Sequence, residues 1–168
     1  MDATASGPFE ISLTSIYTHM DRWETLQRTV RHLPLISPVD QYYVASRFGR
    51  RRDPINKRWA VHKGLDLAGP AGQKIRSPAD GRIVYAGNKG LFGRFIEIDH
   101  GAGIRTRYGH LRRVLVKRGQ RVIHGQEIGI LGSSGRSTGP HVHYEILVDG
   151  KQVNPAKFLK AGRSVFKG

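Results

Sequence analysis

The spacing of apolar residues changes near residue 40. Within the segment 15–33, apolar residues recur at intervals of three and four: Ile16, Met20, Trp23, Leu26 and Val30. These intervals place them on one face of a helix. Pro34 and Pro38 follow this segment, and the chain around them is expected to be an extended connector, because proline does not continue a helix. The pattern therefore predicts a helical arm and linker over residues 1–40.

From residue 41 onward, the apolar residues alternate with a period of two or form short runs. Six such segments are rich in β-branched and aromatic residues and are bounded by Gly, Pro, Asp or Asn: 42–48, 81–87, 94–100, 103–110, 127–133 and 141–150. Segments of this kind are typical of strands, and no helical pattern of 10–15 residues separates them, which argues against β-α-β units. Asp149-Gly150-Lys151 predicts a hairpin turn. The sequence thus predicts a mainly β domain over residues 41–168, an antiparallel β-sandwich or open barrel.

The composition excludes several classes of site. The 168 residues include no Cys, so a disulfide scaffold, a thiolate metal site and a cysteine nucleophile are excluded. The 28 Lys and Arg outnumber the 13 Asp and Glu, which gives a net charge of +15. A charge of this size is typical of proteins that meet polyanions, although it also suits a solvated surface. The basic stretches contain neither an aromatic stacking platform nor a groove-reading motif, so nucleic acid is not the expected partner.

Apolar runs in the chain are too short for a membrane span, which needs about 18 residues. The residues that follow Met1 have neither a basic start nor an apolar core of the kind found in secretory signal peptides. We therefore expect no membrane span in this chain. If the protein is exported, we expect its leader or anchor to lie outside this chain.

Five polar residues could form a metal site with acid–base groups beside it. In a strand, His62 and Asp66 would share one face, and so would His141 and His143. Two histidines and one aspartate can hold a divalent ion and leave a fourth position for water, as in catalytic zinc sites. Only one of His141 and His143 need be a ligand. His110 ends a predicted strand, where a neutral imidazole could accept a proton from water or bond a developing oxyanion.

Each of these patterns is weak alone, because His-x-x-x-Asp occurs often by chance and His-x-His is frequently only a polar strand face. Their combination, in this order and between Gly-rich turns, is more specific. Four other histidines are expected to have no part in metal binding: His19, His32, His100 and His124. Four hydroxyl residues before the last long strand could bind a substrate backbone or stabilise their own loop: Ser133, Ser134, Ser137 and Thr138.

Four segments of the chain resemble the lysostaphin/LytM-type zinc metallopeptidases of the M23 family: HKGLD at 62–66, SPADGRIVYAG at 77–87, RYGHL at 107–111 and GSSGRSTGPHVHYEI at 132–146. The resemblance covers residues 44–159. It implies a two-layer antiparallel β fold of the LytM type and hydrolysis of peptide bonds in bacterial peptidoglycan. It further implies one Zn²⁺ ion held by His62, Asp66 and His143, with His110 and His141 as the catalytic histidines.

The segment RRRDPINKRWAVHKG, residues 50–64, is similar to the Gram-negative envelope endopeptidases. That subgroup implies cleavage of the cross-link between D-Ala and meso-diaminopimelate, in the periplasm or another exported location. The basic surface would then bind anionic envelope polymers. Some family members place a Tyr near the substrate carbonyl, but Trp59 is the only aromatic residue in this segment. One of His110 and His141 would take the proton from water, and the other would hold the oxyanion; which histidine has which role stays open.

Two points of organisation also stay open at this stage. The helix of the arm could be the end of an upstream coiled coil, as the subgroup implies, or it could cover an edge strand. The chain could also be a non-catalytic LytM-type activator or wall-binding module, or an enzyme whose site the arm covers. Lost ligands would mark a non-catalytic member, and this chain keeps all five positions.

A small β carrier domain is a further alternative, because the turns in residues 77–87 and 116–131 are similar to the Pro-Asp-Gly and Gly-Gln turns of such domains. Such carriers lack the combination of His-x-x-x-Asp with His-x-His, and this chain has no lysine in a carrier-type tip turn. The carrier alternative is therefore not favoured.

Overall fold

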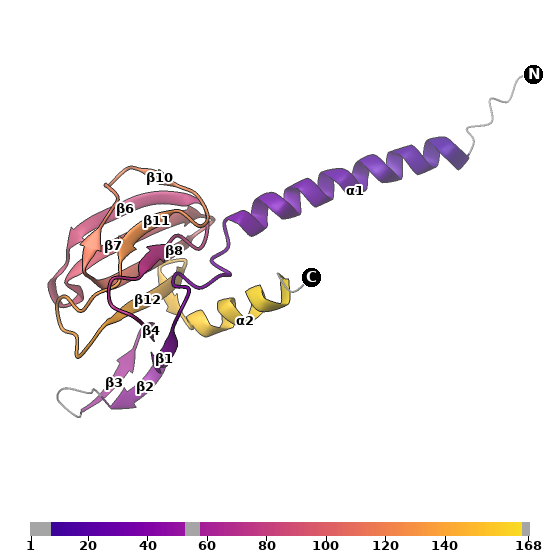
Figure 1. Cartoon of the computed structure of the whole chain (residues 1–168). Coiled ribbons are helices and arrows are strands. Elements are labelled where there is room, and N and C mark those ends of the chain that lie inside the picture. The colour runs from indigo at the N-terminus through magenta and orange to yellow at the C-terminus, as the bar shows by residue number, and fades with distance from the viewer. Residues whose placement is uncertain (1–7, 53–57, 166–168) are drawn as a thin grey trace, which may run out of the picture. The chain divides into compact units, whose positions relative to one another are not determined.

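The computed structural model describes residues 8–52 and 58–165 and contains two compact units, Met1–Arg31 and His32–Gly168 (Figure 1). The first unit contains helix α1 (Pro8–Arg31), which confirms the predicted helix and extends it toward the N-terminus. Pro8 suits the first helical position, because a free N–H is not needed there. No helix in the described part of the chain has both the length and the apolar character needed to cross a membrane.

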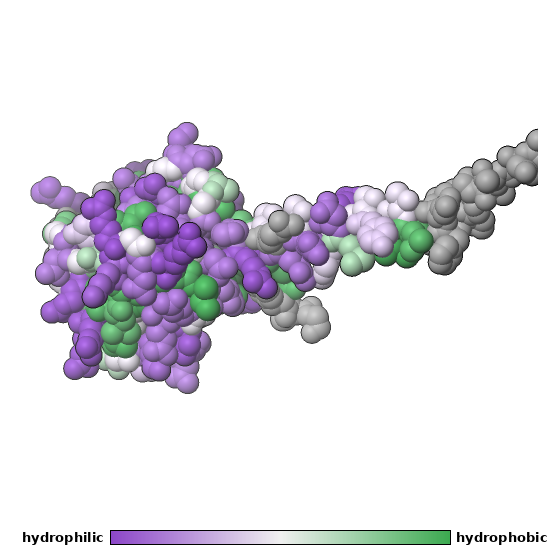
Figure 2. All heavy atoms as spheres, turned by 90° about the horizontal axis from the view of Figure 1, so that it is seen from above, coloured by the Kyte–Doolittle hydropathy of each residue, from purple (hydrophilic) through white to green (hydrophobic). Residues whose placement is uncertain are grey.

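The predicted apolar face of α1 lies at the surface of its unit. Ile16, Met20 and Trp23 are 49%, 55% and 60% exposed. Figure 2 shows apolar patches beside polar ones along this helix. The two interpretations of the arm, as the end of a coiled coil or as the cover of an edge strand, stay predictions.

The second unit is built on an antiparallel sheet in which sequence-distant strands lie side by side. Its strand order is β1 (Tyr43–Ser46), β4 (Leu65–Ala68), β12 (His141–Val148), β8 (Ile104–Leu111), β7 (Arg94–Gly101), β6 (Gly81–Asn88) and β10 (Arg121–Val122), and β13 (Lys151–Val153) also pairs with β12. The six predicted segments each overlap one of these strands or β11 (Glu127–Ile130), so the mainly β prediction is confirmed.

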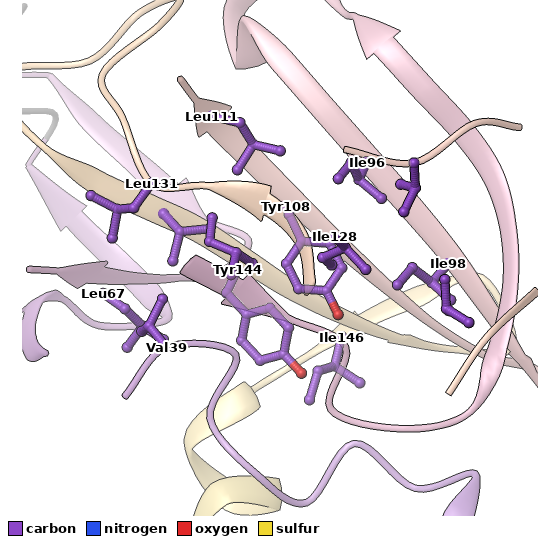
Figure 3. Close-up of a cluster of buried hydrophobic side chains, with 14 of the residues drawn as sticks. Val39, Leu67, Ile96, Ile98, Tyr108, Leu111, Ile128, Leu131, Tyr144 and Ile146 are labelled. Atoms are coloured by element: carbon purple, nitrogen blue, oxygen red, sulfur yellow. The ribbon is translucent and has the colours of Figure 1, made fainter. Parts of the chain in front are cut away.

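Smaller elements complete the unit. They are a three-stranded sheet in the order β5 (Lys74–Arg76), β11 (Glu127–Ile130) and β9 (Arg113–Val114), the hairpin β2 (Gly49–Arg52) and β3 (Trp59–His62), the 3-10 helix η1 (Gly90–Phe92) and helix α2 (Pro155–Val165). Apolar side chains from both larger sheets meet in one core, where Ile128 from β11 lies among Tyr108 from β8 and Tyr144 from β12 (Figure 3). The core sits directly behind the strands that hold the candidate site.

The turn predicted at residues 149–151 is confirmed as the connection between β12 and β13. Asp149 and Gly150 have φ angles of 49° and 76°. Positive φ at both central residues is the geometry of a tight hairpin turn, and Asp-Gly favours it.

The division between the two units falls nine residues before the boundary that the sequence predicts. Residues 32–40 belong to the second unit, where Leu35 and Val39 are buried. Gly162 of α2 permits this packing, because a Cβ atom there would lie 1.8 Å from the carbonyl oxygen of Leu35. The connector is bent rather than extended, with the N–H of Leu35 donating to the carbonyl oxygen of Leu33 at 2.8 Å, and its apolar side chains complete the β unit.

Candidate metal centre

Three strands from two sheets bring the predicted ligands together. His62 ends β3, Asp66 lies in β4, and His143 lies opposite Asp66 on the neighbouring strand β12. His62 and Asp66 occupy successive strands rather than the single strand that their spacing suggested. The chain turns between them at Gly64, where a Cβ atom would lie 2.7 Å from Cε1 of His143. Glycine is therefore needed for the close approach of β12 to this turn.

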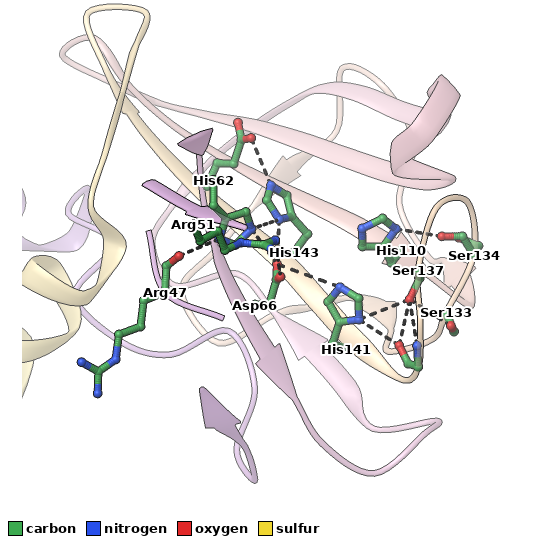
Figure 4. Close-up of polar contacts among 12 residues, drawn as sticks. Arg47, Arg51, His62, Asp66, His110, Ser133, Ser134, Ser137, His141 and His143 are labelled. Carbon is green, nitrogen blue, oxygen red and sulfur yellow. Dashed lines mark hydrogen bonds and ion pairs between the residues drawn. The ribbon is translucent and has the colours of Figure 1, made fainter. Parts of the chain in front are cut away.

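The three side chains converge on a small buried space (Figure 4). Nε2 of His62 lies 3.1 Å from Oδ1 of Asp66 and 3.1 Å from Nδ1 of His143. The same Asp66 oxygen lies 2.8 Å from Nδ1 of His143. Among the described residues, these are the three that group as potential metal ligands, and each is at most 9% exposed.

The outer nitrogens of both ligand histidines have partners that fix the ring orientation. Nδ1 of His62 donates to the carbonyl oxygen of Arg47 at 2.8 Å, and Nε2 of His143 donates to Oε1 of Glu145 at 3.1 Å. When both rings are neutral, their inner nitrogens carry lone pairs that face each other and a carboxylate oxygen. This cluster of acceptors requires a cation, and two imidazoles with one carboxylate suit Zn²⁺. The residues present therefore fit a divalent metal ion.

The electrostatics of the protein groups alone show the same demand for positive charge. Burial alone would lower the pKa of His143, but hydrogen bonds to Asp66 and Glu145 outweigh it and raise that pKa to about 9. Burial would raise the pKa of Asp66, but hydrogen bonds from His143 and His62 hold it well below its usual range. A metal ion and the His143 proton compete for the same lone pair.

Glu145 belongs to an ion-pair network that the sequence analysis did not identify. Its Oε2 lies 3.3 Å from Nη1 of Arg107 on β8, and Nε of Arg107 lies 3.1 Å from Oε2 of Glu97 on β7. The one available signal was the position of Glu145, two residues after His143 and thus on the same strand face. The cross-strand partners depend on strand register, which single-sequence patterns do not specify.

His110 and His141 lie next to each other beside the three ligands, with ring centroids 4.8 Å apart. Nδ1 of His110 donates to the carbonyl oxygen of Ser134 at 2.8 Å, and Nδ1 of His141 donates to that of Gly139 at 2.8 Å. Nε2 of each ring is therefore available for contacts at the site. Nε2 of His141 lies 4.0 Å from Oδ1 of Asp66.

His110 is held in a special environment. Its φ of 63° is uncommon for a residue with a side chain and indicates local backbone strain. Burial, assisted by the neighbouring His141 and His143, lowers its pKa to about 4. The imidazole is therefore neutral at pH 7, and its Nε2 can accept a proton.

Comparison with known proteins identifies the family. Residues 60–155 match Peptidase family M23. The chain belongs to this family.

Two relatives carry the names of DD-endopeptidases, and one of these names includes peptidoglycan. The peptidoglycan DD-endopeptidase ShyA of Vibrio cholerae is 40% identical over 148 residues, which cover 84% of this chain and 34% of that protein. The DD-carboxypeptidase/endopeptidase Mpg of Neisseria meningitidis is 43% identical over 120 residues, covering 71% of this chain and 28% of the relative. The chain thus spans about a third of the length of these curated relatives.

Solved structures confirm the LytM-type fold. A zinc-containing peptidase from Vibrio cholerae has a TM-score of 0.66 at 39% identity, covering 70% of this chain and 37% of the other. The catalytic domain of lysostaphin from Staphylococcus simulans has a TM-score of 0.64 at 32% identity, covering 71% and 92%.

Other polar residues of this M23 chain support the site or lie away from it. The hydroxyl of Ser134 donates to the carbonyl oxygen of Leu111 at 2.7 Å, and that of Ser137 donates to Gly139 at 2.8 Å. Both hydroxyls therefore stabilise the loop that positions His110 and His141. His100 lies within β7 and is buried, with Nε2 2.7 Å from the hydroxyl of Thr106.

Trp59 does not replace the tyrosine that some M23 members carry near the substrate carbonyl. Side chains alternate along β3, so Trp59 and His62 lie on opposite faces of the strand. The Trp59 ring is 61% exposed, and the guanidinium of Arg50 stacks on it at 5.1 Å. Of the candidates named from the sequence, His110 and His141 remain for the oxyanion.

Proposed function

We propose that this chain is a metalloendopeptidase that uses one Zn²⁺ ion to hydrolyse peptide cross-links of peptidoglycan, at the bond between D-Ala and meso-diaminopimelate. The observation that carries the proposal is the acceptor cluster of His62, Asp66 and His143, which requires a cation, with two further histidines beside it. The names of the relatives support peptidoglycan as the substrate. We also propose that the protein acts in the periplasm or another exported location, where this substrate lies.

His62, Asp66 and His143 would hold the ion. A bound Zn²⁺ ion lowers the pKa of a coordinated water and polarises a carbonyl. The neutral His110 accepts a proton from the attacking water at Nε2 and returns it to the leaving amine. His141 places its Nε2 4.0 Å from Oδ1 of Asp66, and from this position it would contact the developing oxyanion.

A digestion experiment tests this function. Purified peptidoglycan is incubated with the zinc-loaded protein, with and without a chelator, and the fragments are analysed by mass spectrometry. We expect loss of cross-linked dimers that the chelator prevents, with new ends at D-Ala and meso-diaminopimelate. Intact dimers after incubation with demonstrably zinc-loaded protein would contradict the proposal.

Two variants separate the roles of the histidines. We expect His143→Ala to lose zinc, because it removes a ligand. His110→Ala should keep zinc but lose on the order of 10²-fold or more in turnover, the usual worth of acid–base catalysis. Zinc content measured on the same samples distinguishes the two effects, and full turnover of zinc-loaded His110→Ala would contradict its role as the base.

A non-catalytic wall-binding or activating role is the less favoured alternative. It would be marked by missing ligands, and all five positions are present and converge. Chelator-insensitive binding to peptidoglycan without cleavage would support that alternative.

A further inference from the structure

A pocket of about 330 Å³ opens beside the candidate metal centre. Its walls include the proposed ligand Asp66, the proposed catalytic residue His141 and two arginines. The lining residues are Ala45, Ser46, Arg51, Arg52, Asp66, Thr138 and His141. A substrate whose scissile bond lies at the metal centre would therefore extend next to these side chains. Arg51 is a charged residue of this pocket that pairs with Asp66 and has no role in the proposed mechanism.

The alternation of β2 directs Arg51 toward the site. In the hairpin register, Arg51 lies opposite Ala60 and Gly49 lies opposite His62, so Arg51 and His62 share a face. Figure 4 shows the Arg51 side chain among the site residues. Arg50 belongs to the other face, where it stacks on Trp59. Two adjacent arginines of one strand thus have different surroundings.

The guanidinium of Arg51 has unused hydrogen-bonding capacity. Its Nη2 lies 3.6 Å from Oδ2 of Asp66, which is an ion pair but too long for a good hydrogen bond. Its Nε is buried and has no hydrogen-bond partner among the described residues. A buried N–H without an acceptor costs free energy, so this position favours a ligand that supplies one. A carboxylate suits it best, because its two oxygens match the planar fork of arginine.

Resting on the proposed function, we infer that Arg51 binds a substrate carboxylate adjacent to the scissile amide. In a D-Ala–meso-diaminopimelate cross-link, the carbon that bears the amide nitrogen also bears a free carboxylate. The D-Ala residue has none, because its carboxyl carbon is the scissile carbonyl. The anionic group nearest the reacting bond is therefore on the leaving amine. Arg51, beside Asp66, is a specificity-determining residue for that group.

The experiment compares two soluble cross-linked dimers with the zinc-loaded full chain. One dimer carries the free carboxylate next to the scissile amide, and the other carries a carboxamide there. We expect the wild type to prefer the free carboxylate by about 10- to 100-fold in kcat/KM, the range for one charge-assisted pair. Arg51→Gln should lose this preference through a higher KM for the carboxylate dimer, and Arg51→Lys should restore part of it. Arg50→Gln, which removes the same charge from the other face of β2, should keep it.

Two results would overturn the inference. The first is an equal loss of kcat on both dimers by Arg51→Gln, with or without loss of zinc, which would make Arg51 a positioning residue for Asp66. The second is a wild type that does not distinguish the dimers.

A binding measurement separates this inference from the proposed function. Calorimetry gives the dissociation constant of the cleaved acceptor peptide, with either the carboxylate or the carboxamide. If wild type binds the carboxylate peptide more tightly than the carboxamide peptide and Arg51→Gln abolishes this difference, the role of Arg51 is supported, even if the cross-link is not the bond that is cut. Equal binding of both peptides to wild type and Arg51→Gln would contradict it.

Discussion

Glu145 shows how a residue outside the candidate ligand set can control it. Its Oε1 accepts from Nε2 of His143, and its Oε2 is paired with Arg107, so the carboxylate has a fixed orientation. This arrangement presents Nδ1 of His143 to Asp66 with a single tautomer. Burial would raise the pKa of Glu145, but the hydrogen bond and charge of His143, together with Arg107, lower it. The carboxylate of Glu145 is therefore charged in the folded protein at neutral pH.

We expect Glu145→Gln to weaken zinc binding by about 10- to 100-fold, because the amide holds His143 less strongly and lowers its basicity. Competition against a chromophoric chelator measures the affinity directly. Glu127→Gln is the matched control, since Glu127 pairs with the exposed Lys74 on another sheet. Unchanged zinc affinity in Glu145→Gln would show that the ring of His143 is held by other contacts.

At the scale of elements, a row of hydrogen-bonded polar side chains connects two neighbouring strands of the sheet inside the core. Nδ1 of His100 on β7 donates to the carbonyl oxygen of Asp80 at 2.7 Å, and its Nε2 accepts from Thr106 on β8. The hydroxyls of Thr106 and Tyr108 are 2.7 Å apart. Burial lowers the pKa of His100 below 6.5, although the nearby Asp99 and the bond to Asp80 oppose the shift.

This burial makes stability depend on pH. A histidine whose folded pKa is below its unfolded value of 6.5 contributes full stability above pH 6.5, and that contribution falls as pH drops below it. We expect the free energy of unfolding in urea to decline from pH 7 to pH 5. His100→Gln cannot titrate, so its decline should be shallower, even though the substitution itself costs about 1–3 kcal/mol. Parallel pH profiles for the two proteins would exclude His100 as the source.

The long strands could be predicted from the sequence, whereas the short elements could not. β7, β8 and β12 each have enough residues for alternation to be visible, but strands of two to four residues such as β9 do not. Helix α2 was not predicted, although its start carries a signal: Pro155 follows Asn154, whose Oδ1 accepts from the N–H of Ala156. The five candidate site residues could be selected from the sequence by their types and spacing, and the resemblance to the M23 family implied their roles. Arg51 and Glu145 gain their surroundings only through cross-strand pairing.

At the scale of the whole molecule, charge is the dominant surface property. The whole chain has a net charge of +15, and the visible face of the second unit is largely hydrophilic in Figure 2. Some arginines are paired with acids, as Arg105 is with Asp99 at 3.1 Å. The large excess of bases nevertheless leaves a strongly positive field around the protein.

We expect this field to accelerate encounters with an anionic cell-wall polymer. The rate of cleavage of intact peptidoglycan should fall steeply as sodium chloride is raised from about 10 mM to 150 mM, because the screening length shrinks from roughly 30 Å to 8 Å. A small soluble dimer with balanced charge should show a much weaker dependence. Equal salt dependence of the two substrates would mean that electrostatic steering does not limit the rate.

The placement of Asp66 and His143 has a consequence for the lifetime of the protein. The two residues are 77 positions apart in the chain, so an ion shared between them acts as a removable tether across a long loop. A ligand that binds only the folded chain adds to stability in proportion to the logarithm of its concentration. Zinc supply would then set how often this edge of the sheet opens to proteases. In a metal-poor compartment the protein would be degraded sooner, and the proposed cleavage of the cell wall would depend on the supply of its own cation.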